Sequence, residues 1–316
     1  MRSERNHIRF TSRRRSGDDV QTFSKGVKHQ MTKTRTLSAL ALLIGLFAMF
    51  AVAGCGSDDD STATDSTSGG SDSGTIDVSD ATLIKDGQLL VGTDAPYPPF
   101  EIGTPEGGDF SGFDKDLMDA IADKLGLTPT YQNSSFDTIF RDVASGQFDI
   151  VAAAATITPE REKVVTFSRP YYEAQQALVV PEGSDITSTD QLSGQVVGVQ
   201  QGTTGQDYAE NETDAKEVRG FAKGADALAA VTTEQVAAAI VDQPFAADAV
   251  NKQGGIEIAQ EISTDEVYGF AMAPDNKLVD GVNEAIQQLI DDGTLNDLYQ
   301  QYFSTDAPDS VVNGGK

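Results

Sequence analysis

Cysteine and histidine are almost missing from this chain of 316 residues. The single cysteine, Cys55, excludes an internal disulfide and a metal site built from cysteines. The two histidines, His7 and His29, both lie near the N-terminus, so the rest of the chain has no histidine for acid–base catalysis or for binding a metal. We therefore expect no metal centre.

Positive charge is also scarce outside the N-terminal region. The formal net charge is −26, and residues 1–54 hold ten of the 23 Lys and Arg but only three of the 49 Asp and Glu. Residues 55–316 are left with 13 basic and 46 acidic side chains. Because binding a phosphate backbone needs a basic face, this balance argues against nucleic acid as a partner. It does not exclude a small anionic ligand, because a small site sets its own local charge.

One long apolar run, residues 37–53, has the flanks of a secretory signal. The basic segment Met31–Arg35 precedes it, and the small residues Val52–Gly54 end it. The run is barely long enough to span a bilayer and Gly45 interrupts it, which favours a signal peptide over a membrane-spanning helix. We expect residues 31–54 to be that signal peptide.

The ending Val52-Ala53-Gly54-Cys55 resembles a bacterial lipobox, whose cysteine is lipidated and becomes the first residue of the mature protein. We expect a lipid on Cys55. Residues 1–30 are polar and patternless, so we expect a non-native extension upstream of the true start. Residues 55–80 are mostly Gly, Ser, Thr and Asp and predict an acidic tether that cannot bury a core. Such a protein works outside the cytoplasm, anchored by its lipid to the cell membrane.

Strands and helices alternate after the tether, which predicts an α/β fold. Residues 89–93 and 148–155 have the apolar character of strands, and residues 128–132 can form another strand between them. Residues 113–125 and 135–146 show apolar side chains at helical spacing. Loops at the carboxyl ends of parallel strands form a ligand crevice in such folds. We expect a crevice at the ends of these strands.

The alternation restarts further along the chain. Strands are predicted at 196–200 and 236–241, with a helix at 225–232 between them, and two helices follow near 280–303. We expect two lobes joined by two crossings, which would permit hinge closure over a cleft. The expected divisions are lobe 1 at 81–178 and 269–305, lobe 2 at 179–268, and a C-terminal tail at 306–316.

The segment Thr156–Arg161 follows an apolar strand and has the signals of a helix start. Thr158 suits the N-cap and Pro159 the first helical position, so free backbone N–H groups would face an anion. Arg161 adds a planar fork that fits one carboxylate with two parallel hydrogen bonds. The segment predicts a binding corner for the α-carboxylate of an amino acid. The alternative is that Arg161 is a surface residue on a well-capped helix.

A second strand-to-helix turn, Gly202-Thr203-Thr204, offers N–H and hydroxyl donors to a carboxylate. It lacks the Lys and the glycine spacing of a P-loop, so we expect no nucleotide site and no cofactor. An ordinary turn with capping threonines would look the same in sequence.

Four further residues are candidates for contact with a ligand. Asp242 ends an apolar strand, where its carboxylate could hold an ammonium group or simply cap the segment that opens at Pro244. Tyr97 and Phe136 could enclose a ligand side chain or belong to the core. Asp94 could contact a distal polar group of the ligand or merely begin a proline-rich turn.

Several stretches together resemble the type 3 extracellular solute-binding proteins, which deliver polar amino acids to ABC importers. They run in order from about Leu89 to Phe303. The matching segments are Val91–Asp94, Tyr97–Phe100, Gly112–Leu117, Thr156–Arg161, Phe167–Tyr172, Val197–Thr204 and Asp292–Leu295. The resemblance implies a two-lobed fold of the periplasmic-binding-protein type II kind, with two parallel or mixed sheets.

The resemblance also implies roles for individual residues. Arg161, Thr156 and Thr204 would hold the α-carboxylate, with Thr203 joining them from the second lobe. Asp242 and the carbonyl of Ala154 would hold the α-ammonium, and Tyr97 and Phe136 would pack on the side chain. The chain departs from the family in four places, with Ala154 and Glu234 where Gly is common, Ala155 where Met is common, and Ala237 where Asp is usual.

We expect a monomeric lipoprotein, not an enzyme, that captures a polar amino acid in a hinged cleft and delivers it to the permease of an ABC transporter. One alternative is an enzyme resembling cyclohexadienyl (prephenate/arogenate) dehydratase, with Glu101 or Glu173 as the general acid. Against it, Asp242 would repel a dicarboxylate substrate. Another is a ligand-sensing domain, although no output domain follows Phe303. The sequence does not name the amino acid, because Asp94 suits either a basic side chain or a neutral amide.

Overall fold

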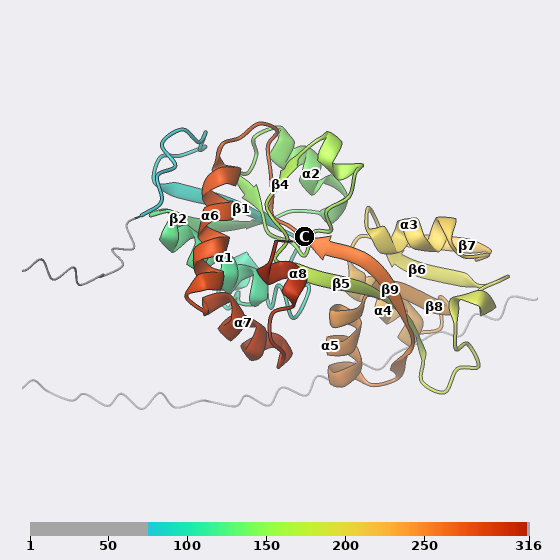
Figure 1. Cartoon of the computed structure of the whole chain (residues 1–316). Coiled ribbons are helices and arrows are strands. Elements are labelled where there is room, and N and C mark those ends of the chain that lie inside the picture. The colour runs from blue at the N-terminus through green and yellow to red at the C-terminus, as the bar shows by residue number, and fades with distance from the viewer. Residues whose placement is uncertain (1–74, 315–316) are drawn as a thin grey trace, which may run out of the picture. The chain divides into compact units, whose positions relative to one another are not determined.

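The computed structural model describes residues 75–314, and every structural statement below concerns that part of the chain (Figure 1). The expected extension at 1–30, the signal peptide at 31–54 and the lipidated Cys55 lie outside the described residues. Within 75–314, no helix combines the length and the apolar character needed to cross a bilayer.

Lobe 1 is built on a mixed sheet of five strands. These are β1 (Gln88–Thr93), β2 (Thr128–Asn133), β3 (Ile150–Val151), β4 (Thr166–Phe167) and β10 (Ala271–Met272). Their order is β2-β1-β3-β10-β4. β1 is parallel to β2 and β3, whereas β10 runs antiparallel to β3 and β4. β3 is shorter than the expected strand at 148–155, and the buried chain that follows it leads directly to the candidate site.

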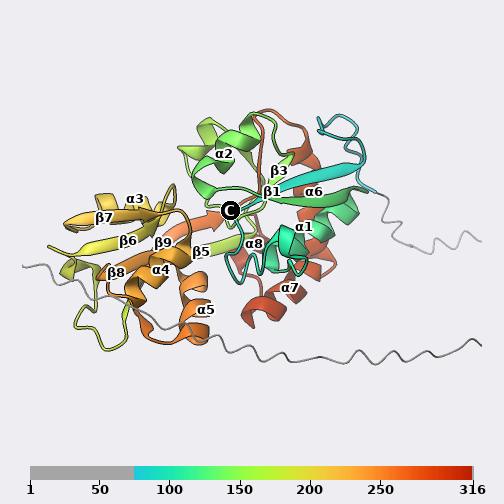
Figure 2. The same ribbon diagram turned by 180° about the vertical axis from the view of Figure 1, so that it is seen from behind.

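Helices cover both faces of this sheet (Figures 1 and 2). They are α1 (Phe113–Lys124), α2 (Phe136–Ala144), α6 (Leu278–Asp291), α7 (Thr294–Phe303) and α8 (Asp309–Val312), with a 3-10 turn η1 at Pro105–Gly107. Side chains of a strand alternate between its two faces. Leu89 and Val91 accordingly pack in one core with α1, α6 and α7, whereas Val151 packs in another core with α2.

Lobe 2 is built on a second mixed sheet. Its strands are β5 (Tyr172–Pro181), β6 (Val196–Gln200), β7 (Glu217–Phe221), β8 (Ala238–Asp242) and β9 (Ile256–Tyr268), in the order β7-β6-β8-β5-β9. β6 is parallel to β7 and β8, and β5 is antiparallel to β8 and β9. The helices are α3 (Thr204–Asn211), α4 (Gly224–Thr232) and α5 (Gln243–Gln253), and a 3-10 turn η3 lies at Thr189–Gln191. The structure thus confirms a mixed α/β fold with two sheets.

The long antiparallel strands β5 and β9 join the two lobes (Figures 1 and 2). The first crossing occurs earlier than expected, because residues 172–178 already belong to the second sheet, where Ala177 and Leu178 pair with β8. The expected boundary of lobe 1 at 178 is therefore corrected to about 171. Tyr172 pairs with Tyr268 at the lobe 1 end of this ribbon.

Two segments placed outside the lobes by the sequence, the end of the tether and the C-terminal tail, are packed onto lobe 1. At the end of the expected tether, the backbone N–H of Ile76 donates to the carbonyl of Lys124 at 2.9 Å, and Ile76 and Val78 pack against the lobe 1 core. In the expected tail at 306–316, Val311 is fully buried, and the guanidinium of Arg169 donates to its carbonyl at 3.1 Å. Lobe 1 covers apolar side chains in both segments. The expected end of the tether at 80 and the expected end of lobe 1 at 305 are therefore corrected, because residues on both sides of these positions belong to lobe 1.

Candidate functional site

A narrow pocket, with a cavity volume of about 10 Å³, is lined by residues of both lobes. All nine residues predicted to contact a ligand line it, namely Asp94, Tyr97, Phe136, Ala154, Thr156, Arg161, Thr203, Thr204 and Asp242. Ala153 and Gln200, which were not predicted, line it as well. The lobe 1 residues follow β1, β2 and β3, and those of lobe 2 lie at or after the ends of β6 and β8. The strand ends converge as expected for an α/β fold.

The predicted helix after Thr158 is wrong. The chain makes a single 3-10 turn, η2 (Arg161–Lys163), and then returns to the sheet through the buried Val165 and β4. Glu160, not Thr158, holds the N-cap position of this turn, although the Thr158 hydroxyl accepts a hydrogen bond from the Arg161 N–H at 3.2 Å. One turn has no appreciable helix dipole, so the cation at this corner is the Arg161 side chain itself.

The Arg161 guanidinium lies in the pocket, and the alternative of a surface arginine is wrong. Nη1 donates to the carbonyl of Thr156 at 2.6 Å, and Nη2 donates to the carbonyl of Gly202 in lobe 2 at 3.0 Å. Its central carbon lies 5.2 Å and 4.6 Å from the ring centroids of Phe136 and Phe140, within the range of cation–π attraction. Desolvation lowers the pKa of Arg161 to about 10, so the group is a cation at neutral pH.

The Asp242 carboxylate is half-buried and is surrounded by neutral donors from both lobes. Oδ2 accepts from the hydroxyls of Tyr97 at 2.9 Å and Tyr268 at 2.7 Å, and Oδ1 accepts from the Gln176 amide at 2.6 Å. Burial raises the pKa of Asp242, and the three hydrogen bonds oppose that rise. Although Asp242 occupies the N-cap position of α5, its side chain accepts no N–H of that helix. The capping alternative is therefore wrong.

The threonine hydroxyls of the pocket are engaged within the protein. Those of Thr156 and Thr204 donate to Oε2 of Glu266 at 3.1 Å and 3.0 Å. Thr203 acts as the N-cap of α3, because its hydroxyl accepts from the Gln206 N–H at 3.2 Å, as the alternative of an ordinary capped turn anticipated. Sequence reasoning missed Glu266, because it lies within the long strand β9 and belongs to no turn or helix-start motif.

Ala154 has a backbone conformation that favours glycine. Its φ is +46°, in the left-handed region, and its N–H donates to Oδ2 of Asp114 at 2.8 Å. Asp114 is fully buried and also accepts from the hydroxyl of Tyr171 at 2.8 Å. Only glycine adopts this region at little cost, which gives a physical reason for the family's preference at this position.

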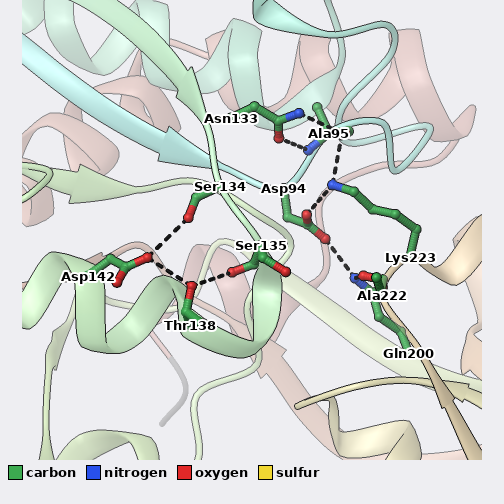
Figure 3. Close-up of polar contacts among 10 residues, drawn as sticks. All are labelled: Asp94, Ala95, Asn133, Ser134, Ser135, Thr138, Asp142, Gln200, Ala222 and Lys223. Atoms are coloured by element: carbon green, nitrogen blue, oxygen red, sulfur yellow. Dashed lines mark hydrogen bonds and ion pairs between the residues drawn. The ribbon is translucent and has the colours of Figure 1, made fainter.

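At the far end of the pocket, Asp94 is held by two residues of lobe 2 (Figure 3). Its Oδ2 accepts from the Gln200 amide at 2.6 Å, and its Oδ1 forms an ion pair with the Lys223 ammonium. Lys223 also donates to the carbonyl of Ala95 at 3.1 Å, while Asn133 brackets the same residue with two hydrogen bonds. Burial raises the pKa of Asp94, and Lys223 and Gln200 partly offset this.

The pocket wall on the α2 side is fixed by a separate group of polar contacts (Figure 3). Oδ2 of Asp142 accepts from the hydroxyls of Thr138 at 2.9 Å and Ser134 at 3.2 Å. Thr138 also reaches the carbonyl of Ser135 at 3.3 Å. These bonds tie the loop after β2 to the first turns of α2 and so position Phe136.

Neither acid considered for the enzyme alternative lines the pocket. Glu101 is fully buried, and burial raises its pKa well above the ordinary value. Glu173 is exposed, forms a hydrogen bond with Ser310, and faces a different cavity on the β5–β9 ribbon. A general acid acts within hydrogen-bond reach of its substrate, and neither glutamate lines the pocket in this structure.

Comparison with known proteins agrees with this geometry. A family model described as bacterial extracellular solute-binding proteins, family 3, matches residues 89–305. An arginine-binding periplasmic protein of Mannheimia haemolytica is 27% identical over 222 residues, which cover 68% of this chain and 91% of the relative.

Two solved structures of an ancestral arginine-binding protein are similar as well. The complex with arginine has 38% identity and a TM-score of 0.65, covering 69% of this chain and 98% of that one. The complex with glutamine has 37% identity and a TM-score of 0.67, covering 70% and 100%. The family match extends over more than half of the sequence. The chain belongs to the bacterial extracellular solute-binding proteins of family 3.

Proposed function

We propose that this protein captures a free polar amino acid between its lobes and delivers it to the permease of an ABC importer. The observation that carries the proposal is that Arg161 of lobe 1 and Asp242 of lobe 2 line the same pocket. A guanidinium and a carboxylate on opposite walls match the α-carboxylate and α-ammonium of a zwitterion. The relatives described above support the ligand class, since one is named for arginine and another was solved with arginine and with glutamine.

Each group at this end of the pocket has a role in the proposal. Arg161 holds the ligand carboxylate, and the hydroxyls of Thr156 and Thr204 turn from Glu266 toward it, joined by Thr203. Asp242 and the carbonyl of Ala154 hold the ammonium. The remaining lining residues, Tyr97, Phe136 and Asp94, contact the side chain.

Closure follows from a ligand that bridges both lobes. Each charge-assisted hydrogen bond contributes roughly 1.5–3 kcal/mol, offset by desolvation and by ordering of the partners. Micromolar affinity needs about −8 kcal/mol, which a few such bonds can supply. Because the ligand contacts both lobes only when they are together, binding shifts the population toward the closed form that the permease recognises.

The same proposal covers the N-terminal region and the oligomeric state. We place a lipid on Cys55, which holds a monomer at the outer face of the cell membrane. Mass spectrometry of the protein extracted from membranes should find a first peptide that begins at lipid-modified Cys55, and a first residue elsewhere would overturn the anchor. Sedimentation of the detergent-free Cys55→Ala variant should give the mass of one chain.

We propose binding without catalysis. Glu101 and Glu173 lie outside the pocket, and Asp242 would repel a second carboxylate of prephenate. Incubation with prephenate or arogenate should therefore release no phenylpyruvate or phenylalanine above the rate without protein. Turnover would contradict this part of the proposal.

Calorimetry with the twenty common amino acids tests the function directly. We expect at least one dissociation constant below about 10 μM, and a melting temperature that rises with ligand concentration, because a ligand that binds only the folded state stabilises it. If no amino acid binds below about 1 mM, the proposed function is wrong.

A further inference from the structure

Asp94, which lines the pocket, is paired with a cation of the protein that lies behind the pocket wall. Lys223 precedes α4 in lobe 2, and its ammonium pairs with Oδ1 of Asp94 in lobe 1. The same ammonium donates to the carbonyl of Ala95 at 3.1 Å. Gln200 completes the group by donating to Oδ2 of Asp94 at 2.6 Å (Figure 3). Both oxygens of this buried carboxylate are thus partnered by side chains of the opposite lobe.

We infer that the pocket selects an amino acid whose side chain ends in a neutral amide, and that Lys223 is the residue that disfavours a cationic side chain. This inference rests on the proposed function, because it assumes that the zwitterion lies between Arg161 and Asp242. The ligand side chain then extends toward Asp94, at the other end of the same pocket.

A guanidinium or ammonium that reached Asp94 would lie beside the Lys223 ammonium. Like charges at hydrogen-bond distance repel, and the repulsion is stronger where water is excluded. Asp94 is only 4% exposed, whereas the Lys223 side chain is 30% exposed. Two further carboxylates act on this pair. Asp137 is exposed and therefore screened by solvent. Glu101 is fully buried, and burial raises its pKa well above the ordinary value, which favours its neutral form. Asp94 is thus already neutralised by the protein.

A neutral amide complements this arrangement on both sides. Its NH2 group can donate to an oxygen of Asp94, and its carbonyl can accept from the Lys223 ammonium or the Gln200 amide. A carboxylate side chain would satisfy Lys223 but would be repelled by Asp94. The pairing therefore favours a side chain with one donor and one acceptor over either charged type.

Arginine and citrulline provide a matched pair of probes, because a neutral ureido group replaces the guanidinium at nearly the same shape. Calorimetry on the full-length chain should show citrulline or glutamine binding at least tenfold more tightly than arginine. Lys223→Met keeps the length of the side chain and removes its charge. In this variant, the ratio of the arginine to the citrulline dissociation constant should fall at least tenfold. Lys252→Met, at a surface lysine of α5, should leave the ratio unchanged.

Each outcome decides one of the two proposals. If arginine binds the wild-type chain as tightly as citrulline and glutamine or more so, the inference is overturned and the proposed function stands. If no amino acid binds, the proposed function itself fails. If the ratio of the arginine to the citrulline dissociation constant is the same in Lys223→Met as in the wild type, Lys223 does not determine the selectivity. Because the wild-type ratio needs no variant, the test remains decisive even if Lys223→Met does not fold.

Discussion

The two ends of the pocket treat charge in opposite ways. At one end, Arg161 contacts backbone carbonyls and aromatic rings, and Asp242 accepts from two hydroxyls and an amide. Neither forms a salt bridge with another side chain among residues 75–314. At the other end, Asp94 is paired directly with Lys223.

This difference indicates how recognition is divided. The direct hydrogen-bond partners of Arg161 and Asp242 are neutral, although the Glu266 carboxylate acts on both from nearby. A charge without a direct ion pair in a partly desolvated pocket gains most binding free energy when an opposite charge arrives. A charge already paired by the protein gains little from a second partner. The Arg161–Asp242 end is therefore suited to the two charges common to all free amino acids, and the Asp94–Lys223 end to discrimination among side chains.

The largest expected effect is at Arg161. Arg161→Ala should weaken amino acid binding at least 100-fold, because it removes the only side-chain cation that lines the described pocket and two charge-assisted bonds to the ligand. Calorimetry measures the change. Arg141→Ala, at an exposed arginine of α2, serves as the control and should bind normally. If Arg161→Ala and Arg141→Ala bound the amino acid with equal affinity, Arg161 would not be the residue that recognises the ligand carboxylate.

Asp242→Asn should weaken binding roughly 10- to 100-fold, since the ammonium loses its counter-charge. The asparagine oxygen can still accept from Tyr97 and Tyr268, so the melting temperature should change little. Affinity and melting temperature are to be measured on the same sample. If the melting temperature falls while the affinity of the folded protein is unchanged, Asp242 has a structural role. Asp242 would then not recognise the ammonium group of the ligand.

Beneath both ends, the buried Asp114 should make stability depend on pH. Burial raises the pKa of Asp114 to about 6, above its ordinary value of 3.8. The folded state then binds more protons than the unfolded state between pH 4 and 6, so this group lowers the free energy of unfolding as pH rises through that window.

Urea unfolding of the wild type and Asp114→Asn at pH 4, 5, 6 and 7 tests this. The variant minus wild-type difference in the free energy of unfolding should become more positive from pH 4 to 6 and level off above. A difference independent of pH would show that Asp114 does not titrate in this range.

The smallest effect is expected far from either end of the pocket. Glu234 is exposed and has a φ of +55°, where an L-residue pays a conformational cost. Glu234→Gly relieves this conformational cost, because glycine adopts the left-handed region freely. The larger loss of backbone entropy that glycine undergoes on folding offsets part of the gain, so the free energy of unfolding should rise by about 0.5–1 kcal/mol. Affinity should stay the same. Lower stability in the variant would show that the Glu234 side chain makes a compensating contact.

The residues predicted for the Arg161–Asp242 end line one pocket, and they could be named from the sequence because they lie in short motifs at the ends of apolar strands. Thr156–Arg161 and Gly202–Thr204 can each be recognised from a few neighbouring residues that follow an apolar strand. The topology of an α/β fold then brings the ends of such strands together. The predicted helix after Thr158 failed because the buried Val165 returns the chain to the sheet after one turn. Local capping signals cannot show how soon tertiary packing ends a helix.

Of the Asp94–Lys223 pair, only Asp94 was identified as a candidate from the sequence. Asp94 is marked by its place between a strand and a proline-rich loop, but Lys223 lies 129 residues further along the chain. No periodicity or motif joins the two positions. Glu266 was missed for the same reason, since it meets Thr156 across 110 residues. Long-range partners of this kind become visible only when the fold brings the lobes together.

The most direct test of the central claim is to block each end of the zwitterion in turn. For the amino acid that binds most tightly in the panel, calorimetry should compare the free form with its Nα-acetyl and α-amide derivatives. The account predicts that each derivative binds at least 100-fold more weakly, since each loses one of the two charges that Arg161 and Asp242 recognise. Binding of either derivative within threefold of the free amino acid would contradict it.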